Sequence, residues 1–226
     1  IITKTGWEEQ GAMITGSYGN FNSTNNSFVA GVGNEEISLL LSGNFYYSDE
    51  PYFPDIYKDE YTWYNERYKT NGEMQVSPWD SSVVTLPVKP YETPTTSYAI
   101  HAKLNIKDFE MGYFRNFESH SSSISTMPQY SVYSVDASFK YLVESFYTRY
   151  NYVSKNKKIS LLTTLSHNRD EIDPKTLYSN NFTSYLDGYK YAFNRSLKIE
   201  EQATFHITDA NILVAGISYE DITALA

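Results

Sequence analysis

The chain has 226 residues, a formal net charge of −9 and no cysteine, and 16% of its residues are aromatic. The acidic balance argues against a nucleic-acid partner, because phosphate binding needs an excess of Lys and Arg on one surface. The lack of cysteine argues against a disulfide scaffold and against Cys-based zinc sites or catalysis. No run of 18 apolar residues occurs, so the sequence predicts no membrane-spanning helix.

Alternation of polar and apolar residues is the main pattern in the sequence, and helical periodicity is hard to find. The alternating segments run for about ten residues, the length that a tilted strand needs to cross a bilayer. In chain order we expect nine strands, at residues 10–20, 26–34, 36–47, 96–107, 109–119, 144–154, 158–169, 188–207 and 211–221.

The connections between these strands alternate between short and long. The short ones are expected at 33–35, 107–108, 154–157 and 208–210, and the long ones at about 48–95, 120–143 and 170–187. This alternation is typical of an up-and-down barrel, with tight turns at one rim and long loops at the other. We therefore predict an all-β fold, an antiparallel up-and-down transmembrane β-barrel that is partial, with about nine strands of a larger barrel.

Two strands define the predicted faces most clearly. We expect one set of side chains to face lipid: Ile37, Leu39, Leu41, Ile100, Leu104 and Ile106. The other set should face the lumen: Ser38, Ser42, His101, Lys103 and Asn105. Glu201 is an exception on an otherwise apolar face, for which we expect a bulge or an overlong strand. Residues 129–143 also alternate in places, which predicts a hairpin within a long loop.

The start of the chain resembles a known junction. Ile1-Ile2-Thr3-Lys4, followed by Ser17-Tyr18-Gly19-Asn20-Phe21-Asn22-Ser23-Thr24, is similar to the passage from plug to barrel in TonB-dependent outer-membrane receptors. The resemblance implies that residues 1–5 are the last strand of a plug domain and residues 6–226 the N-terminal portion of the barrel. Barrels of this family have 22 strands and a plugged lumen, so the plug and the closing strand are expected outside this sequence.

The resemblance also implies a function. Such a receptor binds a scarce solute, such as a ferric siderophore, haem, cobalamin or a similar compound, and imports it with energy transduced by TonB. The expected partners are this small-molecule or metal-chelate substrate, TonB through the region before Ile1, and lipid of the outer membrane of a Gram-negative bacterium. No covalent chemistry is done on the substrate, so we expect no catalytic residue, no cofactor and no metal site.

The segment between Tyr46 and Pro94 is the main candidate for ligand binding. It carries eleven aromatic rings among carboxylates, which suit a cap that closes over the barrel mouth. A loop that only shields the barrel is the alternative. From this segment, and from the lumen-facing polar residues expected near the long-loop rim, we select Trp63, Tyr64, Trp79, His101, Asn116 and Arg149 as ligand-binding candidates. Tyr57 to Tyr68 alternatively form a short amphipathic helix, since four tyrosines recur there at a spacing of three to four.

Two other functions remain open on the sequence alone. An outer-membrane barrel protease or phospholipase would need a histidine paired with Ser, Asp or Glu at the rim, and His120 and His167 are the candidates. A soluble all-β module that binds carbohydrate through an aromatic face would stay in solution without detergent.

Overall fold

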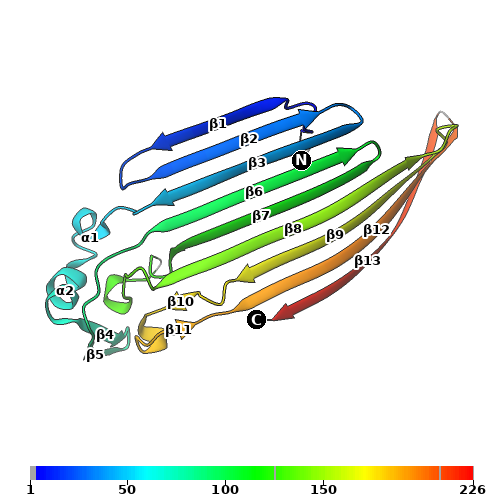
Figure 1. Cartoon of the computed structure of the whole chain (residues 1–226). Coiled ribbons are helices and arrows are strands. Elements are labelled where there is room, and N and C mark those ends of the chain that lie inside the picture. The colour runs from blue at the N-terminus through cyan, green and yellow to red at the C-terminus, as the bar shows by residue number, and fades with distance from the viewer. Residues whose placement is uncertain (1–3, 125, 209, 226) are drawn as a thin grey trace.

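The computed structural model describes residues 4–124, 126–208 and 210–225. Nine strands form one antiparallel sheet in the order β1-β2-β3-β6-β7-β8-β9-β12-β13, and each strand pairs with its neighbours along the chain (Figure 1). These strands are β1 (Gly11–Tyr18), β2 (Thr24–Gly33), β3 (Ile37–Ser48), β6 (Thr95–Ile106), β7 (Phe109–Ser121), β8 (Ser138–Val153), β9 (Ile159–Ile172), β12 (Ala192–Thr208) and β13 (Asn211–Leu225). The nine predicted strands are therefore confirmed.

The smaller elements lie in the loops. They are α1 (Phe53–Ile56), a π-helical turn at Tyr64–Tyr68, α2 (Lys69–Asn71), the hairpin of β4 (Glu73–Ser77) and β5 (Asp80–Thr85), and the pair β10 (Leu177–Tyr178) and β11 (Gly188–Tyr189), with short 3-10 turns at Pro128–Tyr130 and Asn181–Thr183. None of them joins the large sheet.

Short and long connections fall at opposite ends of the sheet, as predicted (Figure 1). The turn at Lys107-Asp108 has only two residues between β6 and β7, and Lys107 adopts a positive φ of 51° there. The amide of Asn151, on β8 near the next turn, donates to the carbonyl of Asp108 at 2.9 Å, which places two of the tight turns side by side. The three long loops gather at the other end.

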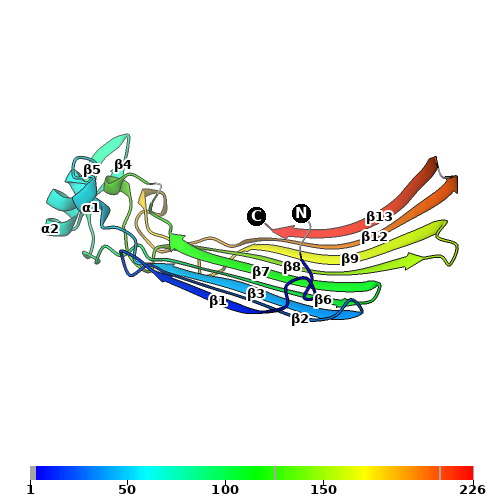
Figure 2. The same cartoon turned by 90° about the horizontal axis from the view of Figure 1, so that it is seen from above.

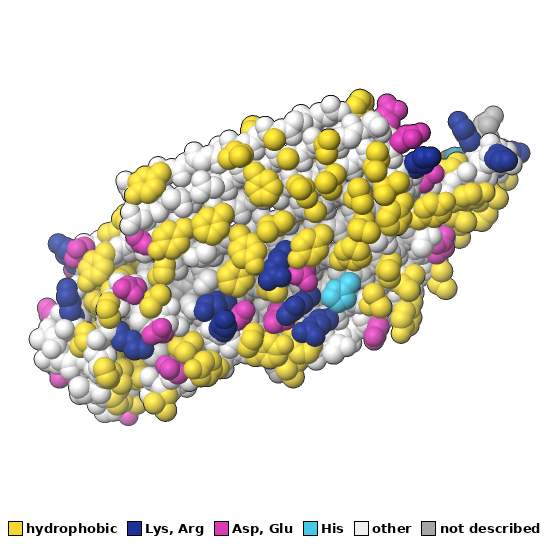
Figure 3. Space-filling view, viewed as in Figure 1, with side chains coloured by type: hydrophobic (Ala, Val, Ile, Leu, Met, Phe, Trp, Pro, Cys, Tyr) yellow, Lys and Arg dark blue, Asp and Glu magenta, His cyan; other side chains and the backbone are white. Residues whose placement is uncertain are grey.

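The strand register gives the sheet an apolar and a polar face. Ile37 pairs with Ile106, Leu39 with Leu104 and Leu41 with Ala102, and because directly opposed residues share a face, these side chains lie together. Ser38, Ser42, His101, Lys103 and Asn105 lie on the other face. The predicted division of these two strands is confirmed. Figure 3 views the apolar face, on which hydrophobic side chains form a broad exposed band across the strands.

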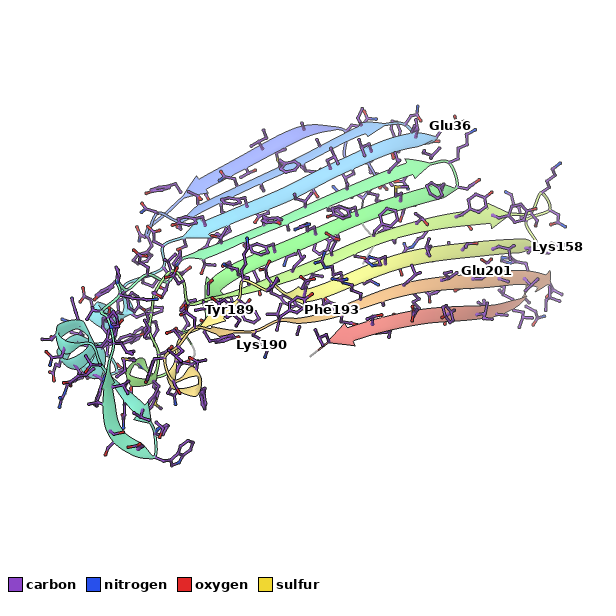
Figure 4. The ribbon with its side chains drawn as sticks, turned by 60° about the horizontal axis from the view of Figure 1, so that its bottom comes forward. Glu36, Lys158, Tyr189, Lys190, Phe193 and Glu201 are labelled. Atoms are coloured by element: carbon purple, nitrogen blue, oxygen red, sulfur yellow. The ribbon has the colours of Figure 1, made fainter. Side chains whose placement is uncertain are left out.

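Glu201 lies on the apolar face, where its carboxylate accepts a hydrogen bond from the Thr163 hydroxyl at 2.5 Å. The pairing of β12 with both neighbours is regular at Glu201, so the predicted bulge is wrong at this position. In register, Glu201 is level with Tyr150 and Phe109, and Phe109 begins β7. Beyond this level, β12 extends farther than the turn between β6 and β7 (Figure 4). The alternative, an overlong strand, fits this arrangement.

The segment before β1 folds back onto the polar face. Residues 6–9 form a turn in which Glu8 accepts hydrogen bonds from the backbone amide and the hydroxyl of Thr5, at 2.7 and 3.0 Å. A side chain at Gly6 would collide with the carbonyl of Leu39, and one at Gly31 would collide with that of Glu9. Two glycines thus permit backbone-to-backbone contact. Lys4 and Thr5 belong to no strand, and the rest of the predicted plug strand, residues 1–3, lies outside the described residues.

The sheet is bowed along its strands (Figure 2). The segment before β1 and the long loops lie on the same side of it, the side of the polar face. One predicted detail is wrong: residues 129–143 form no hairpin, because a 3-10 turn at Pro128–Tyr130 leads into an extended segment and β8 already begins at Ser138. Ser131, in this extended segment, forms an isolated β-bridge with Asn180 of the next loop. The alternating sequence of this segment therefore reflects contact between two loops and not a local hairpin.

Candidate functional site

The three long loops pack into one unit, here called the cap, which consists of residues 49–94, 122–124, 126–137 and 173–191. All three loops supply buried residues to its core. The first loop supplies Tyr61, Tyr64, Tyr68 and Met74, the second Val132 and Tyr133, and the third Tyr185. Phe53, Leu86 and Tyr91 pack against this cluster. The cap therefore has a hydrophobic core of its own, supplied by segments far apart in the sequence.

Tyr185 connects all three loops. Its hydroxyl lies within hydrogen-bonding distance of the carbonyl oxygens of Gln75 in the first loop and Gln129 in the second. A further link between loops is the backbone hydrogen bond from the amide of Val132 to the carbonyl of Ser179, at 2.9 Å. These bonds satisfy polar groups inside the cap and fix the loops to one another.

Tyrosine rings fill the centre of the cap. Tyr91 and Tyr133 stack with ring centroids 5.1 Å apart, and the Tyr68 hydroxyl accepts a hydrogen bond from the amide of Lys89 at 2.9 Å. Tyr64 is only 3% exposed, so its ring packs on protein and reaches a ligand only if the cap opens. The predicted helix at Tyr57 to Tyr68 is present from Thr62 onward, and its tyrosine side faces this core.

The two predicted tryptophans occupy different settings. The Trp63 indole is half-buried and donates a hydrogen bond to the carbonyl of Glu73 at 2.9 Å, with the Arg67 guanidinium 5.6 Å from its ring centre. Trp79 lies at the tip of the β4–β5 hairpin and is 88% exposed. Trp63 is therefore part of the cap structure, and Trp79 is the ring most open to a partner arriving from solution.

A cavity of about 480 Å³ lies where the cap joins β3. Rings and carboxylates line it together: Tyr47, Asp49, Glu50, Tyr52, Tyr91 and Glu92, with Pro51, Thr93, Pro94 and Val135. Asp49 is held by hydrogen bonds from the Tyr47 hydroxyl and the Asn22 amide, both at 2.5 Å, which lower the pKa of this carboxyl. Asp49 is therefore charged at neutral pH, and the cavity suits a cationic or neutral ligand with an apolar surface.

The three other candidate residues lie on the polar face of the sheet. His101 is on β6 and Asn116 on β7, and both point to the same side as Lys103. Arg149 shares this face but lies near the tight turns, where it is 3.6 Å from Glu110 and stacks over the Tyr147 ring. The prediction that Arg149 lies near the long-loop rim is thus wrong. Glu110 also pairs with Lys103 at 3.2 Å, so both cations have a structural partner.

The sequence predicted the rings of the cavity only as members of a longer aromatic segment. Tyr47, Tyr52 and Tyr91 belong to the eleven aromatic residues between Tyr46 and Pro94, but nothing in their spacing separated them from the rings of the core. Glu92 was missed altogether. Its role depends on how the two ends of the loop meet above β3 and β6, which the sequence pattern does not encode.

The two histidines considered for a hydrolase lie on opposite faces of the sheet. His120 lies on the polar face, where its ring nitrogen contacts the carbonyl of Ser121 at 3.0 Å and the ring packs against Phe139. His167 lies on the apolar face, opposite Leu197. Among the described residues, no three His, Asp or Glu side chains gather closely enough to hold a metal ion.

Alkaline pH is expected to unfold the cap. Burial raises the pKa values of five tyrosines above their ordinary value of 10: Tyr64, Tyr68, Tyr91, Tyr133 and Tyr185. The folded cap holds the protonated rings, so their contribution to stability is complete below pH ~10. Above pH ~10, the stabilisation from each tyrosine with a raised pKa falls by about 1.4 kcal/mol per pH unit, until the pH reaches the pKa of that tyrosine in the folded cap.

The measurement is a titration from pH ~9 to ~12 that follows tyrosinate absorbance, proteolysis of the loops and far-UV circular dichroism of the sheet. Loop cleavage should begin as the buried tyrosines ionise, while the sheet signal persists. Ionisation of all tyrosines near pH 10 with an intact cap would contradict the buried tyrosine core.

Among the described residues, no helix has both the length and the apolar composition of a membrane span. No protein-family model matches the chain, and comparison with curated proteins and with solved structures finds no match either.

Proposed function

We propose that the chain is the N-terminal barrel portion of a TonB-dependent outer-membrane receptor, which binds and imports a scarce solute such as a ferric siderophore, haem or cobalamin. The observation that carries the proposal is the sheet itself. Nine sequential antiparallel strands combine one exposed apolar face with one polar face, and tight turns and long loops lie at opposite ends. An outer-membrane barrel needs all three features, with apolar side chains toward lipid and polar ones toward the lumen.

The polar face supports a filled lumen. The segment of residues 4–9 lies against this face, over the backbone of Leu39 and Gly31, so the chain enters the sheet from the side of the polar face. In a plugged receptor the chain would pass from the plug into the first barrel strand in this way. Lys103 is 6% exposed in its side chain and paired with Glu110, which suits a lumen whose polar groups are satisfied by protein.

The cap supports solute binding at the loop end. Its cavity of about 480 Å³ falls within the usual volume of small-molecule sites and combines tyrosine rings with carboxylates. In this proposal Tyr47, Tyr52 and Tyr91 contact the solute, and Asp49, Glu50 and Glu92 orient it. Substrate, TonB and outer-membrane lipid are the partners, and the receptor performs no covalent chemistry.

Surface labelling tests the topology of the proposal. These 226 residues contain no cysteine, so Trp79→Cys and Lys155→Cys each introduce a single thiol into this part of the full-length protein. A maleimide that cannot cross membranes should label the Trp79→Cys protein on intact cells, because the loop end faces outward. It should label the Lys155→Cys protein only after the outer membrane is permeabilised. Equal labelling of both on intact cells, or release of the protein without detergent, would contradict the proposal.

A further inference from the structure

A charged patch interrupts the apolar face. Arg115 on β7, Glu144 on β8, Arg169 on β9 and Arg195 on β12 are directly opposed in register and form one row across four strands. We call this row the arginine patch, together with Lys140 and Glu171, which the register places on the same face. Figure 3 shows such a cluster of basic and acidic side chains inside the hydrophobic band.

Ion pairs and hydrogen bonds organise the patch. Arg115 is 3.1 Å from Glu144 and donates to the Tyr98 hydroxyl, also at 3.1 Å. Glu171 accepts a hydrogen bond from the Arg169 side chain at 2.6 Å and is 3.6 Å from Arg195. The Glu171 side chain is 7% exposed, whereas Arg195 is 44% exposed. Glu171 is therefore covered, and the guanidinium groups of the patch are more exposed than its carboxylates.

The patch carries more positive than negative charge. Arg169 and Arg195 face each other directly across two strands and share the carboxylate of Glu171. Like charges directly opposed destabilise a sheet unless a counter-charge lies between them. Four cationic and two anionic side chains give the patch a net charge of +2, in a chain of net charge −9. Asp221 on β13 lies opposite Leu197 and is the next acidic residue along this face. With Asp221 included, the net charge of the patch is still positive.

Apolar residues border the patch on both sides along the strands. Toward the tight turns the next positions include Phe146 and Leu197, and toward the cap they include Phe117, Leu142 and Phe193. The Arg195 guanidinium lies 4.6 Å from the centre of the Phe193 ring. A charged side chain that faces hydrocarbon costs about 2–4 kcal/mol at mid-membrane and much less near the interface. An anionic group with attached acyl chains would satisfy both the arginines and their apolar border.

We propose that the arginine patch binds the phosphate group of an anionic lipid in the leaflet on the cap side. This inference rests on the proposed function, since it requires the apolar face to contact lipid. Arg169 and Arg195 would contact the phosphate, because planar guanidinium groups match its oxygens in pairs. Arg115 and Lys140 would add charge, and Phe146 and Leu197, on the side of the patch toward the tight turns, would pack against the acyl chains. Basic pockets on membrane proteins bind lipid headgroups by the same chemistry.

The test uses the full-length protein in detergent, titrated with bisphosphorylated lipid A, with its dephosphorylated form and with inorganic phosphate. Removing two charges by Arg169→Gln together with Arg195→Gln should weaken binding of the phosphorylated lipid by at least about tenfold. Arg169→Lys with Arg195→Lys keeps the charge and should bind the phosphorylated lipid more tightly than the Gln variant but more weakly than the parent, since Lys binds phosphate as a point charge without the paired contacts. The matched control, Lys157→Gln with Lys158→Gln, removes two charges at the tight-turn end and should leave binding unchanged.

The outcomes separate this inference from the proposed function. Heat-modifiable migration on a gel reports whether each variant is a folded barrel. Folded Gln variants that bind the phosphorylated lipid like the parent would overturn the patch alone, as would equal binding of the dephosphorylated lipid. Binding of inorganic phosphate with the same affinity would overturn the lipid assignment. A parent protein that stays soluble without detergent would instead overturn the proposed function.

Discussion

Deleting residues 52–80 is expected to lower solute affinity and uptake by at least about tenfold, a loss of about 1.4 kcal/mol or more. The deletion removes Tyr61, Tyr64, Tyr68 and Met74 from the core of the cap and Tyr52 from the cavity. The second and third loops then lose their packing partner, and the rings of the cavity lose their fixed positions. The large sheet should persist, because its strand pairing includes no residue of this range.

Uptake is measured with labelled ferric siderophore, haem and cobalamin, using whichever solute the parent protein imports. Phe182→Ser is the matched control, since Phe182 is an exposed ring of the third loop, lies outside the deleted range and is not part of the hydrophobic core of the cap. Heat-modifiable migration shows whether the barrel is inserted. Unchanged affinity in a correctly inserted deletion variant would show that the cap only shields the barrel. The polar face around His101 and Asn116 would then be the remaining candidate site.

A positive charge introduced among the apolar side chains of β3 is expected to destabilise the inserted protein. Leu41 and Ser42 are adjacent on β3 but lie on opposite faces of the sheet. Under the proposed function, Leu41→Arg would direct a guanidinium to lipid and Ser42→Arg would direct it to the lumen. The first should cost about 2–4 kcal/mol of barrel stability, and the second much less.

Urea unfolding in detergent or lipid vesicles measures this difference, and the fraction of heat-modifiable protein in outer membranes gives its consequence in cells. The paired substitution controls for the size and charge of the new side chain. Equal losses of stability at both positions would show that the two faces do not meet different environments.

The sheet was predictable because each strand carries its own signal. In β3 and β6 alternate side chains are apolar on one face and polar on the other, and this period of two is a local property that neighbouring sequence reveals. Strand ends were less accurate. β8 begins at Ser138 and not at residue 144, since its first residues pair with β7 beyond the apolar band, where alternation no longer distinguishes the faces.

The cap was not predictable in the same way. Its core joins Tyr64, Tyr133 and Tyr185, and only the folded sheet brings their three loops to one place. An aromatic loop residue that packs in such a core has the same local sequence as one that contacts a ligand. The helical spacing of the tyrosines from Tyr57 to Tyr68 did carry a signal, because rings on one side of a short helix usually face a core.

The account depends most directly on which face of the sheet contacts lipid, and β9 provides the sharpest test. Leu161-Leu162-Thr163-Thr164-Leu165 does not alternate in polarity, so only the register assigns Leu161, Thr163 and Leu165 to the apolar face and Leu162 and Thr164 to the polar one. Single cysteines at these five positions, spin-labelled in the full-length protein in lipid vesicles, report collisions with oxygen and with a water-soluble nickel complex. The account predicts that labels at 161, 163 and 165 collide with oxygen and are shielded from nickel, and that labels at 162 and 164 are not exposed to lipid. Nickel access at 161, 163 and 165 equal to that at 162 and 164 would contradict it.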